Sequence, residues 1–332
     1  MTQRPPNPVL GVIIPCYNEE AVLPALFDAL DRLDETLSQP VYFLFIDDGS
    51  TDGTLAMLAD RCDRDERCAC LSFSRNFGHQ DAVSAGLRHI RGDLVAVLDA
   101  DLQDPPSVLP AFVERWNAGY DVVYGVRINR KERWPLRLAY AFFYRMLKKI
   151  AQVEVPLDAG DFSLMDRRVV DVINRMPEHN RFIRGLRGWV GFRQIGVPYE
   201  RNARRSGASK YPFGKLMKLA LDGLTAFSSV PLRLASWLGA LASLFGLCYL
   251  VYALIRRASG DPPPEGWTST IVIILFLGGI QLMMLGILGE YIGRIFDEVK
   301  NRPHYIQQRE YGWLAEEPPA SAEATPQPIP SR

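Results

Sequence analysis

The sequence predicts an α/β protein with a mostly parallel sheet, followed by two helices that are long and apolar enough to cross a membrane. Two observations support this organisation. Over residues 8–125, short apolar runs of strand length alternate with segments of helical periodicity. This βαβα pattern is typical of a sheet with helices on both faces. Further along, residues 234–255 and 267–289 hold no charged side chain, and each reaches the ~20 residues that span the hydrocarbon core.

Four segments have the composition of buried strands, and one helix is visible between the first two. The strands are expected at residues 9–14, 41–46, 94–98 and 122–124. The helix is expected because apolar residues recur at helical spacing, at Leu23, Leu26, Leu30, Leu33 and Leu37. Thr51 and Pro106 are residue types that begin helices. Ligands of such sheets gather at the carboxyl ends of the strands, so the residues after each strand are the first candidates for a site.

The two charge-free segments predict a transmembrane hairpin. A pair of buried core helices would need a large domain around them, and only about 40 residues follow the second segment. The connector at 256–266 is short and rich in proline, which puts both ends of the hairpin on one side of the membrane. Lys and Arg are more frequent outside the connector than in it, so the positive-inside rule places the N-terminal part and both termini in the cytoplasm.

Two further segments have the pattern of amphipathic helices at a membrane surface. Apolar side chains recur at helical spacing over about 135–150 and over 211–230, with Lys and Arg beside both stripes. The cations of such a helix face anionic lipid headgroups. An ordinary domain helix with a solvated charged face is the alternative, above all for the first segment.

The formal net charge of zero hides a strong segregation of charge. The chain has 38 Lys and Arg against 38 Asp and Glu. Residues 127–149 hold eight cations and one acid, and residues 181–218 hold ten cations and one acid. Together these two segments carry +16, and the rest of the chain carries −16. Zero overall argues against nucleic acid as a partner, whereas the basic segments predict a bound anion.

Polar motifs follow the first two expected strands. After the first come Pro15, Tyr17 and Glu19, which could cup a planar base and accept from its N–H, although they also make a good strand-to-helix turn. The second strand ends in two aspartates and a glycine turn. Carboxylates at a strand end suit the polar edge of a nucleoside, and of the two we favour Asp48. Asp52 nearby suits a helix cap.

The third expected strand runs into an acidic cluster. In an extended chain Asp99 and Asp101 point to the same side, and Gln103 adds a neutral oxygen. This oxygen set suits Mg²⁺ or Mn²⁺, with room for water and phosphate oxygens. Without a cation, two like charges would lie side by side at a cost in free energy.

These three motifs, in this order, are followed by a Val-Tyr-Gly-Val-Arg run at 123–127 and a basic loop at 204–211. With the Gly-Glu-Tyr-Ile-Gly-Arg run at 289–294, they resemble the membrane polyprenyl-phosphate glycosyltransferases of glycosyltransferase family two. That group includes dolichol-phosphate mannose synthases, bactoprenol glucosyltransferases of the GtrB type and the aminoarabinose transferases of lipid A modification. The resemblance covers about residues 8–307.

The resemblance implies a cytoplasmic GT-A domain over residues 1–210 that moves one sugar from a nucleotide donor to a lipid-linked phosphate. It implies a juxtamembrane helix over 211–230, two transmembrane helices within 231–293 and a cytoplasmic C-terminal segment over 294–332. The composition of this last segment, rich in Pro, Ala and Ser, predicts disorder from about 316.

The family's site residues are carried over position by position. The nucleoside would be held by Pro15, Tyr17, Glu19, Ile46 and Asp48, and the metal and diphosphate by Asp99, Ala100, Asp101 and Gln103. Phosphates of donor and acceptor would be held by Arg127, Arg204 and Lys210. Asp158 and Asp161 lie in the stretch that reaches the reacting sugar in GtrB-type enzymes.

The implied reaction is an inverting, metal-dependent transfer of glucose from UDP-glucose to undecaprenyl phosphate at the bacterial inner membrane, for modification of cell-envelope glycans. A phosphate monoester has a second pKa of about 6, so the acceptor is largely dianionic at pH 7 and needs no strong base. Arg and Lys offset the repulsion between the two anions, and a divalent cation takes up charge on the leaving diphosphate. Asp158 or Asp161 then orients the sugar or the acceptor, and a role as base stays open.

Several alternatives are left. The donor could instead be UDP-N-acetylglucosamine, GDP-mannose or a UDP-aminoarabinose derivative. A processive polysaccharide synthase is a second alternative. Such synthases share a Gln-x-x-Arg-Trp motif and have more membrane spans, and the sequence has neither feature. A catalytically silent membrane scaffold is disfavoured by the complete acidic cluster, and a channel by spans without an ionisable residue. Glycines such as Gly278 and Gly286 permit close helix packing and predict a homo-oligomer.

Overall fold

The computed structural model describes residues 4–128, 159–178, 181–201, 230–259 and 266–315. They fall into two units, one formed within 1–137, 154–209 and 303–332, the other within 138–153 and 210–302. The predicted amphipathic helices at about 135–150 and 211–230 and the predicted disordered tail lie outside the described residues.

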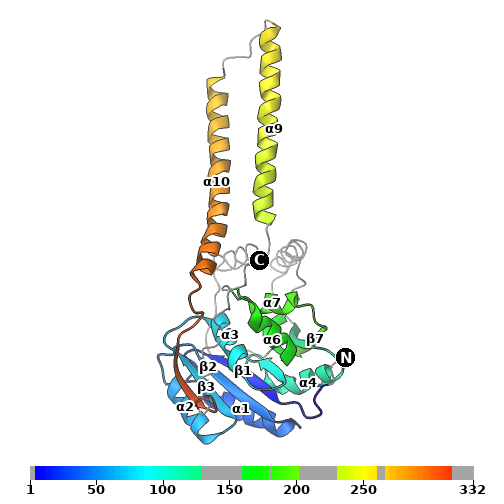
Figure 1. Cartoon of the computed structure of the whole chain (residues 1–332), viewed down its shortest axis with the longest axis vertical. Helices are drawn as coiled ribbons and strands as arrows, with labels where there is room; N and C mark the ends of the chain where they lie inside the picture. Colours follow the sequence, from blue (N-terminus) through cyan, green and yellow to red (C-terminus); the bar gives the residue numbers. More distant parts are fainter. Residues whose placement is uncertain (1–3, 129–158, 179–180, 202–229, 260–265, 316–332) are drawn as a thin grey trace, which may run out of the picture. The chain divides into compact units, whose positions relative to one another are not determined.

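The first unit is built on a single sheet of eight strands (Figure 1). The strand order is β7-β5-β6-β4-β1-β2-β3-β8. The strands are β1 (Leu10–Cys16), β2 (Val41–Asp47), β3 (Cys68–Phe73), β4 (Leu94–Val97), β5 (Val122–Ile128), β6 (Ala159–Asp166), β7 (Gln194–Glu200) and β8 (Gln307–Gly312). The four strands expected from the sequence correspond to β1, β2, β4 and β5, which confirms the α/β class.

The sheet has a parallel centre and mixed edges. Strands β4, β1, β2 and β3 are parallel neighbours, so their carboxyl ends lie at one edge of the sheet. Strand β6 is inserted between β4 and β5 and runs antiparallel to both, while β7 runs parallel to β5. The amino end of β6 therefore lies beside the carboxyl end of β4, and the sheet brings β6 into the region where ligands of parallel sheets bind.

Helices cover both faces of the sheet (Figure 1). One core packs β1 and β2 against α1 (Leu23–Thr36), α2 (Thr54–Arg64) and α4 (Leu109–Asn117), which follows the 3₁₀ turn η1 (Pro106–Val108). The other core packs the opposite face against α3 (His79–His89), α6 (Arg167–Arg175) and α7 (Ile183–Trp189). Alternation along β1 explains the division, because Val12 and Ile14 join the first core and Ile13 joins the second.

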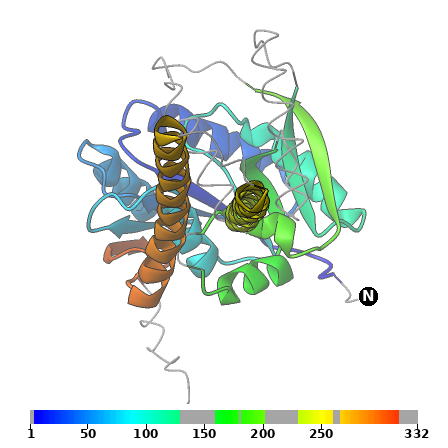
Figure 2. The ribbon, with the colours of Figure 1, turned by 90° about the horizontal axis from the view of Figure 1, so that it is seen from above.

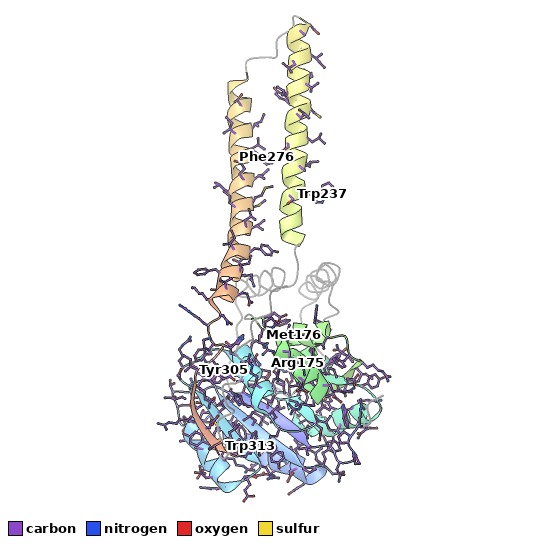
Figure 3. All side chains as sticks on the ribbon, viewed as in Figure 1. Arg175, Met176, Trp237, Phe276, Tyr305 and Trp313 are labelled. Atoms are coloured by element: carbon purple, nitrogen blue, oxygen red, sulfur yellow. The ribbon has the colours of Figure 1, made fainter. Side chains whose placement is uncertain are left out.

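Strand β8 pairs antiparallel with β3 at the edge of the sheet and was not predicted from the sequence. Next to it, Trp313 is 4% exposed and donates its indole N–H to the carbonyl of Arg67 at 3.3 Å, and Tyr305 stacks on Phe73 with ring centroids 4.8 Å apart. Figure 3 labels Trp313 and Tyr305 in this unit. The predicted domain limit at residue 210 leaves this strand out, because β8 is a polar edge strand without apolar alternation.

The second unit contains two long apolar helices, α9 (Val230–Ala258) and α10 (Trp267–Lys300). They run in opposite directions, and seen from above α9 is viewed end-on while α10 is viewed obliquely (Figures 1 and 2). A Cβ added at Gly239 of α9 would lie 3.6 Å from the methyl group of Met284 on α10. Both helices are long and apolar enough to cross a membrane, over Gly239–Arg256 and Val272–Lys300.

Large apolar side chains project from both helices without protein contacts to cover them. Trp237 is 75% exposed and Phe276 is 66% exposed, and Figure 3 labels Trp237 on α9 and Phe276 on α10. No residue of the two apolar windows is buried, within the part of the chain that the structure describes. Exposed apolar surface on this scale is costly in water, which supports membrane association.

Candidate active site

The carboxylates of Asp99 and Asp161 meet at the carboxyl edge of the sheet because of strand register. Val97 at the end of β4 pairs with Ser163 of the antiparallel strand β6. Continued by two residues on each strand, this register sets Asp99 opposite Asp161. The sequence predicted an extended chain through Asp99 and Asp101, and this prediction is wrong. Strand β4 ends at Val97, and Leu102 has a φ of 56°.

Three side chains from two helices converge on one oxygen of Asp161. Its Oδ2 lies 3.4 Å from the amide nitrogen of Gln80, 3.3 Å from Arg184 and 3.6 Å from Nε2 of His79. Its Oδ1 is buried and accepts no hydrogen bond from the described residues. Asp161 is therefore fixed through Oδ2, while Oδ1 is available to a ligand.

The surroundings give the two carboxylates different protonation behaviour. Burial raises the pKa of Asp99 to about 6, with the charge of Asp161 adding to the rise and His79 opposing it. Burial also acts to raise the pKa of Asp161, but the contact with His79 and the charge of Arg184 outweigh it and hold that pKa below its ordinary value. Asp161 consequently remains ionised at neutral pH and is a weak base.

A second cluster fixes Arg127, which the sequence analysis assigned to phosphate binding. The fully buried Asp104 accepts a hydrogen bond from the hydroxyl of Tyr199 at 2.5 Å and lies 3.3 Å from Arg127 and 3.4 Å from Arg201. The same hydroxyl accepts from Nε of Arg127 at 3.2 Å. One buried carboxylate thus holds two partly exposed guanidinium groups close together, an arrangement that suits an anion.

The loops after β1 and β2 are tied to each other. The amide of Asn18 donates to Oγ of Ser50 at 3.0 Å, and the Asn18 side chain accepts from the amide of Thr51 at 2.8 Å. The amide of Gly53 donates to the carboxylate of Glu20 at 2.8 Å, and the carboxylate of Asp52 accepts from the backbone amide of Thr54, the first residue of α2, at 3.0 Å. These hydrogen bonds between the two loops fix the shape of the predicted nucleotide-binding region.

Asp48 is already engaged by backbone groups. Its two oxygens accept from the amides of Phe77 and Gly78, at 2.7 and 2.9 Å. Burial raises the pKa of Asp48, and these two amides oppose that rise. In this structure Asp48 fixes the loop before α3, and each of its oxygens keeps one further lone pair for a ligand.

The other residues assigned to the nucleoside differ in accessibility. Tyr17 is 45% exposed, and Glu19 is partly buried, its amide donating to Thr54 at 2.8 Å. Pro15 is buried within β1. The side chains of Ile46 and Ala100 are buried in the core. Ile46 and Ala100 can therefore contact a nucleotide-sugar donor only through main-chain atoms.

The predicted metal ligands Asp99, Asp101 and Gln103 lie in the turn that follows β4. Asp99 Oδ1 is buried and accepts no hydrogen bond from the described residues, and Asp101 Oδ1 accepts from the amide of Gln103 at 3.0 Å. Gln103 itself is 4% exposed. Within the described ranges, no set of three or more His, Cys, Asp or Glu side chains is gathered as a metal site. Two carboxylates and an amide oxygen would leave several coordination positions to phosphate and water, as Mg²⁺ prefers.

Three predicted site residues, Asp158, Arg204 and Lys210, lie outside the described residues. The structure also changes the picture of the second basic segment, which the sequence analysis treated as a surface for an anion. Arg181 and Arg187 are 3% and 2% exposed. Arg187 approaches the carbonyl of Gly160 at 3.5 Å, next to Asp161, so part of this basic segment serves the interior.

Five residues of these two clusters were not predicted from the sequence: His79, Gln80, Arg184, Asp104 and Tyr199. A signal existed for His79, because it follows Gly78 shortly after β3 and so comes from the carboxyl end of a central parallel strand. Because β3 was not predicted from the sequence, the position of His79 after that strand was not recognised either. Arg184 and Tyr199 reach the site only through the positions of α7 and β7, which no local pattern predicts.

The sheet, its acidic edge and the apolar helices define a GT-A type glycosyltransferase that associates with membranes. Residues 11–173 match the model of glycosyl transferase family 2, and residues 230–295 match that of the GtrB C-terminal hairpin. The chain is 44% identical over 303 residues to the uncharacterized glycosyltransferase YkcC of Bacillus subtilis (strain 168), covering 91% of this chain and 94% of the relative. The chain belongs to glycosyl transferase family 2.

Two further similarities were found. Over 303 residues the chain is 40% identical to the SfII prophage-derived bactoprenol glucosyl transferase of Shigella flexneri, covering 91% of this chain and 98% of the relative. Among solved structures, it is similar to glucosyl-3-phosphoglycerate synthase from Mycobacterium tuberculosis in complex with Mn²⁺, UDP and glucosyl-3-phosphoglycerate. That similarity covers 66% of this chain and 78% of the other, at 19% identity and a TM-score of 0.45.

Proposed function

We propose that this glycosyltransferase transfers one glucose from UDP-glucose to undecaprenyl phosphate, with inversion, at the cytoplasmic face of the bacterial inner membrane. Relatives named bactoprenol glucosyl transferase support the acceptor and the sugar. The observation that carries the proposal is the presence, in one chain, of an acidic and arginine-lined sheet edge and two apolar helices. A soluble acceptor would give the enzyme no need of those helices.

The chemistry needs little from the protein beyond positioning and charge. An oxygen of the acceptor phosphate attacks the anomeric carbon, the bond from that carbon to the donor diphosphate breaks, and the nucleoside diphosphate leaves with the electron pair. A single displacement inverts the anomeric carbon. Because the acceptor is largely dianionic at pH 7, no side chain has to remove a proton from it.

Named residues have distinct parts in this proposal. Arg127, held by Asp104 and Tyr199, offsets the repulsion between the two phosphate groups. Asp161 is ionised and has Oδ1 unpaired, so it accepts a hydrogen bond from a sugar hydroxyl and orients the sugar. Asp161 is too weak a base for proton removal, which favours the orienting role over the role as base.

A divalent cation completes the proposed site. Asp99, Asp101 and Gln103 would hold Mg²⁺ or Mn²⁺, since Asp99 Oδ1 is buried and unpaired and the set is made of hard oxygens. When bound, the cation takes up negative charge on the leaving diphosphate.

A donor screen tests the proposal. The full-length protein in native membranes is incubated with polyprenyl phosphate, Mg²⁺ or Mn²⁺ and a panel of UDP- and GDP-sugars, and the lipid product is weighed by mass spectrometry. We expect a lipid phosphate carrying one hexose with UDP-glucose. Asp101→Ala should abolish it, whereas Asp60→Ala, at an exposed ion pair with Arg64, should not. Undiminished product with Asp101→Ala would overturn the metal assignment.

A further inference from the structure

His79 lies between the two acidic side chains of the site and belongs to neither of the motifs that contain them. Its Nε2 is 3.7 Å from Oδ1 of Asp99 and 3.6 Å from Oδ2 of Asp161. The side chain is 43% exposed. Asp99 follows β4 and Asp161 lies on β6, whereas His79 is the first residue of α3.

The backbone before His79 is fixed by Asp48. The carboxylate of Asp48 accepts from the amides of Phe77 and Gly78, and Gly78 has a φ of 112°, a conformation that favours glycine. The ring of His79 is thus aimed at the acidic pair by a residue at the end of β2. This support reduces the freedom of the ring before any substrate binds.

One nitrogen cannot serve both carboxylates fully. Nε2 carries at most one hydrogen, and the two acceptors are at nearly equal distances, both longer than a hydrogen bond. When a cation other than His79 binds one of the two carboxylates, the Nε2 hydrogen of His79 therefore becomes available to the second carboxylate. Asp161 already has Gln80 and Arg184 on the same oxygen, whereas Oδ1 of Asp99 has no hydrogen-bond partner among the described residues.

We propose that His79 is a positioning residue whose Nε2–H is shared by Asp99 and Asp161 and is given over to Asp161 when a divalent cation holds Asp99. The inference rests on the proposed function in one respect, the cation at Asp99. It assigns His79 a part in coupling the donor side of the site to the sugar-orienting carboxylate. His79 competes with the cation for Asp99 and supports Asp161 afterwards.

Two measurements on the full-length protein in detergent test this role. Mn²⁺ binding is measured by electron paramagnetic resonance without substrates, for wild type, His79→Ala and His79→Gln. Removing a partly exposed competitor for Asp99 should tighten Mn²⁺ binding about two- to fivefold in His79→Ala. Transfer kinetics should show a kcat reduced about 10- to 100-fold in His79→Ala, the usual effect of losing an outer support, with the KM for the sugar donor nearly unchanged. His79→Gln keeps an N–H donor and should recover most of kcat.

His89 provides the matched control, since it lies on the same helix and contacts Tyr305 at 3.1 Å instead of the acidic pair. His89→Gln should change neither Mn²⁺ affinity nor kcat. Weaker Mn²⁺ binding in His79→Ala would make His79 a metal ligand, and unchanged binding would show that it does not compete for Asp99; either result overturns the proposal. An unchanged kcat in His79→Ala would also overturn the proposal. If wild type transfers no sugar from any donor, the proposed function fails, and the Mn²⁺ measurement still decides the shared contact.

Discussion

Asp161 has Gln80, Arg184 and His79 around a single oxygen and leaves the other oxygen buried and without a hydrogen bond from the described residues. Such an arrangement orients a carboxylate for one more hydrogen bond and keeps it charged. It differs from the environment of a general base, whose pKa would lie near neutral pH. The role of Asp161 is therefore best tested by a change that keeps its shape and removes its charge.

Asp161→Asn should lower kcat by about 10²- to 10³-fold, the usual loss for one group that contacts the reacting centre. Because the acceptor phosphate supplies its own nucleophilic oxygen, the variant should keep a measurable rate. The measurement is steady-state transfer by full-length protein in detergent, with Asp60→Asn as an exposed control. A loss smaller than about fivefold would contradict a contact between Asp161 and the substrate.

Tyr199 joins Arg127 to Asp104 through one hydroxyl. Burial, with the hydrogen bond to Asp104, raises the pKa of Tyr199 to about 12, so the hydroxyl is neutral and donates at all working pH values. Tyr199→Phe should raise the KM for the lipid acceptor about tenfold, because a charge-assisted contact that positions Arg127 is lost. Tyr120→Phe, in the same unit, is the comparison. An unchanged acceptor KM would show that Arg127 is positioned without this hydroxyl.

At the scale of elements, the sequence predicted four of the eight strands of the described residues, and it missed β3 although that strand is fully buried. Strands β1, β2, β4 and β5 were identified, and the helix with Leu23, Leu26, Leu30 and Leu33 buried was confirmed as α1. Strand β8 was missed because it is a polar edge strand. The acidic residues of the site were found from local motifs, whereas His79, Arg184 and Tyr199 were not, because register and helix placement bring them there.

The segment after α10 contributes to the stability of the sheet unit. Trp313 is 4% exposed, its indole donates to Arg67, and the guanidinium of Arg91 lies 4.5 Å from its ring centroid. Trp313→Ala should destabilise this unit by about 3 to 5 kcal/mol, through lost burial and a cavity. Thermal unfolding of the purified protein measures this, with Trp189→Ala as control since Trp189 is 65% exposed. Equal midpoints for the two variants would contradict the packing of this segment.

Asp65, the residue after α2, forms ion pairs with Arg61 and Arg67, both at 2.8 Å. The hydrogen bond from Arg67 lowers the pKa of Asp65 to about 2, although burial acts against it. A lowered pKa means that the stabilisation is complete above the unfolded value of about 4 and is lost as the pH falls through about 2. Asp65→Asn should therefore cost about 1 to 2 kcal/mol at pH 7 and almost nothing at pH 2. A cost that does not change with pH would contradict the ion pair.

For the whole molecule, membrane association has a direct chemical test in the cysteines. Cys16, Cys62, Cys68 and Cys70 are buried, and burial raises the pKa of all four thiols, so they react poorly. Cys248 has no protein cover and lies within the apolar window of α9. In membranes, a lipid environment should keep a water-soluble maleimide from Cys248, and labelling should appear only after detergent solubilisation.

Two variants control that labelling. Cys248→Ser should remove the signal, and Ser259→Cys, which follows the last residue of α9, should be labelled in membranes once the reagent has access to the connector side. Rapid labelling of Cys248 in intact membranes would contradict a membrane-spanning α9.

In the proposed reaction, this glycosyltransferase places one sugar on a lipid-linked phosphate. The most direct measurement is the stoichiometry of nucleoside diphosphate released to lipid-linked hexose formed, by mass spectrometry, with UDP-glucose and undecaprenyl phosphate as substrates. We expect one UDP to be released for each lipid phosphate that gains a single hexose. UDP release without a lipid-linked sugar, or a lipid carrying a chain of sugars, would contradict it.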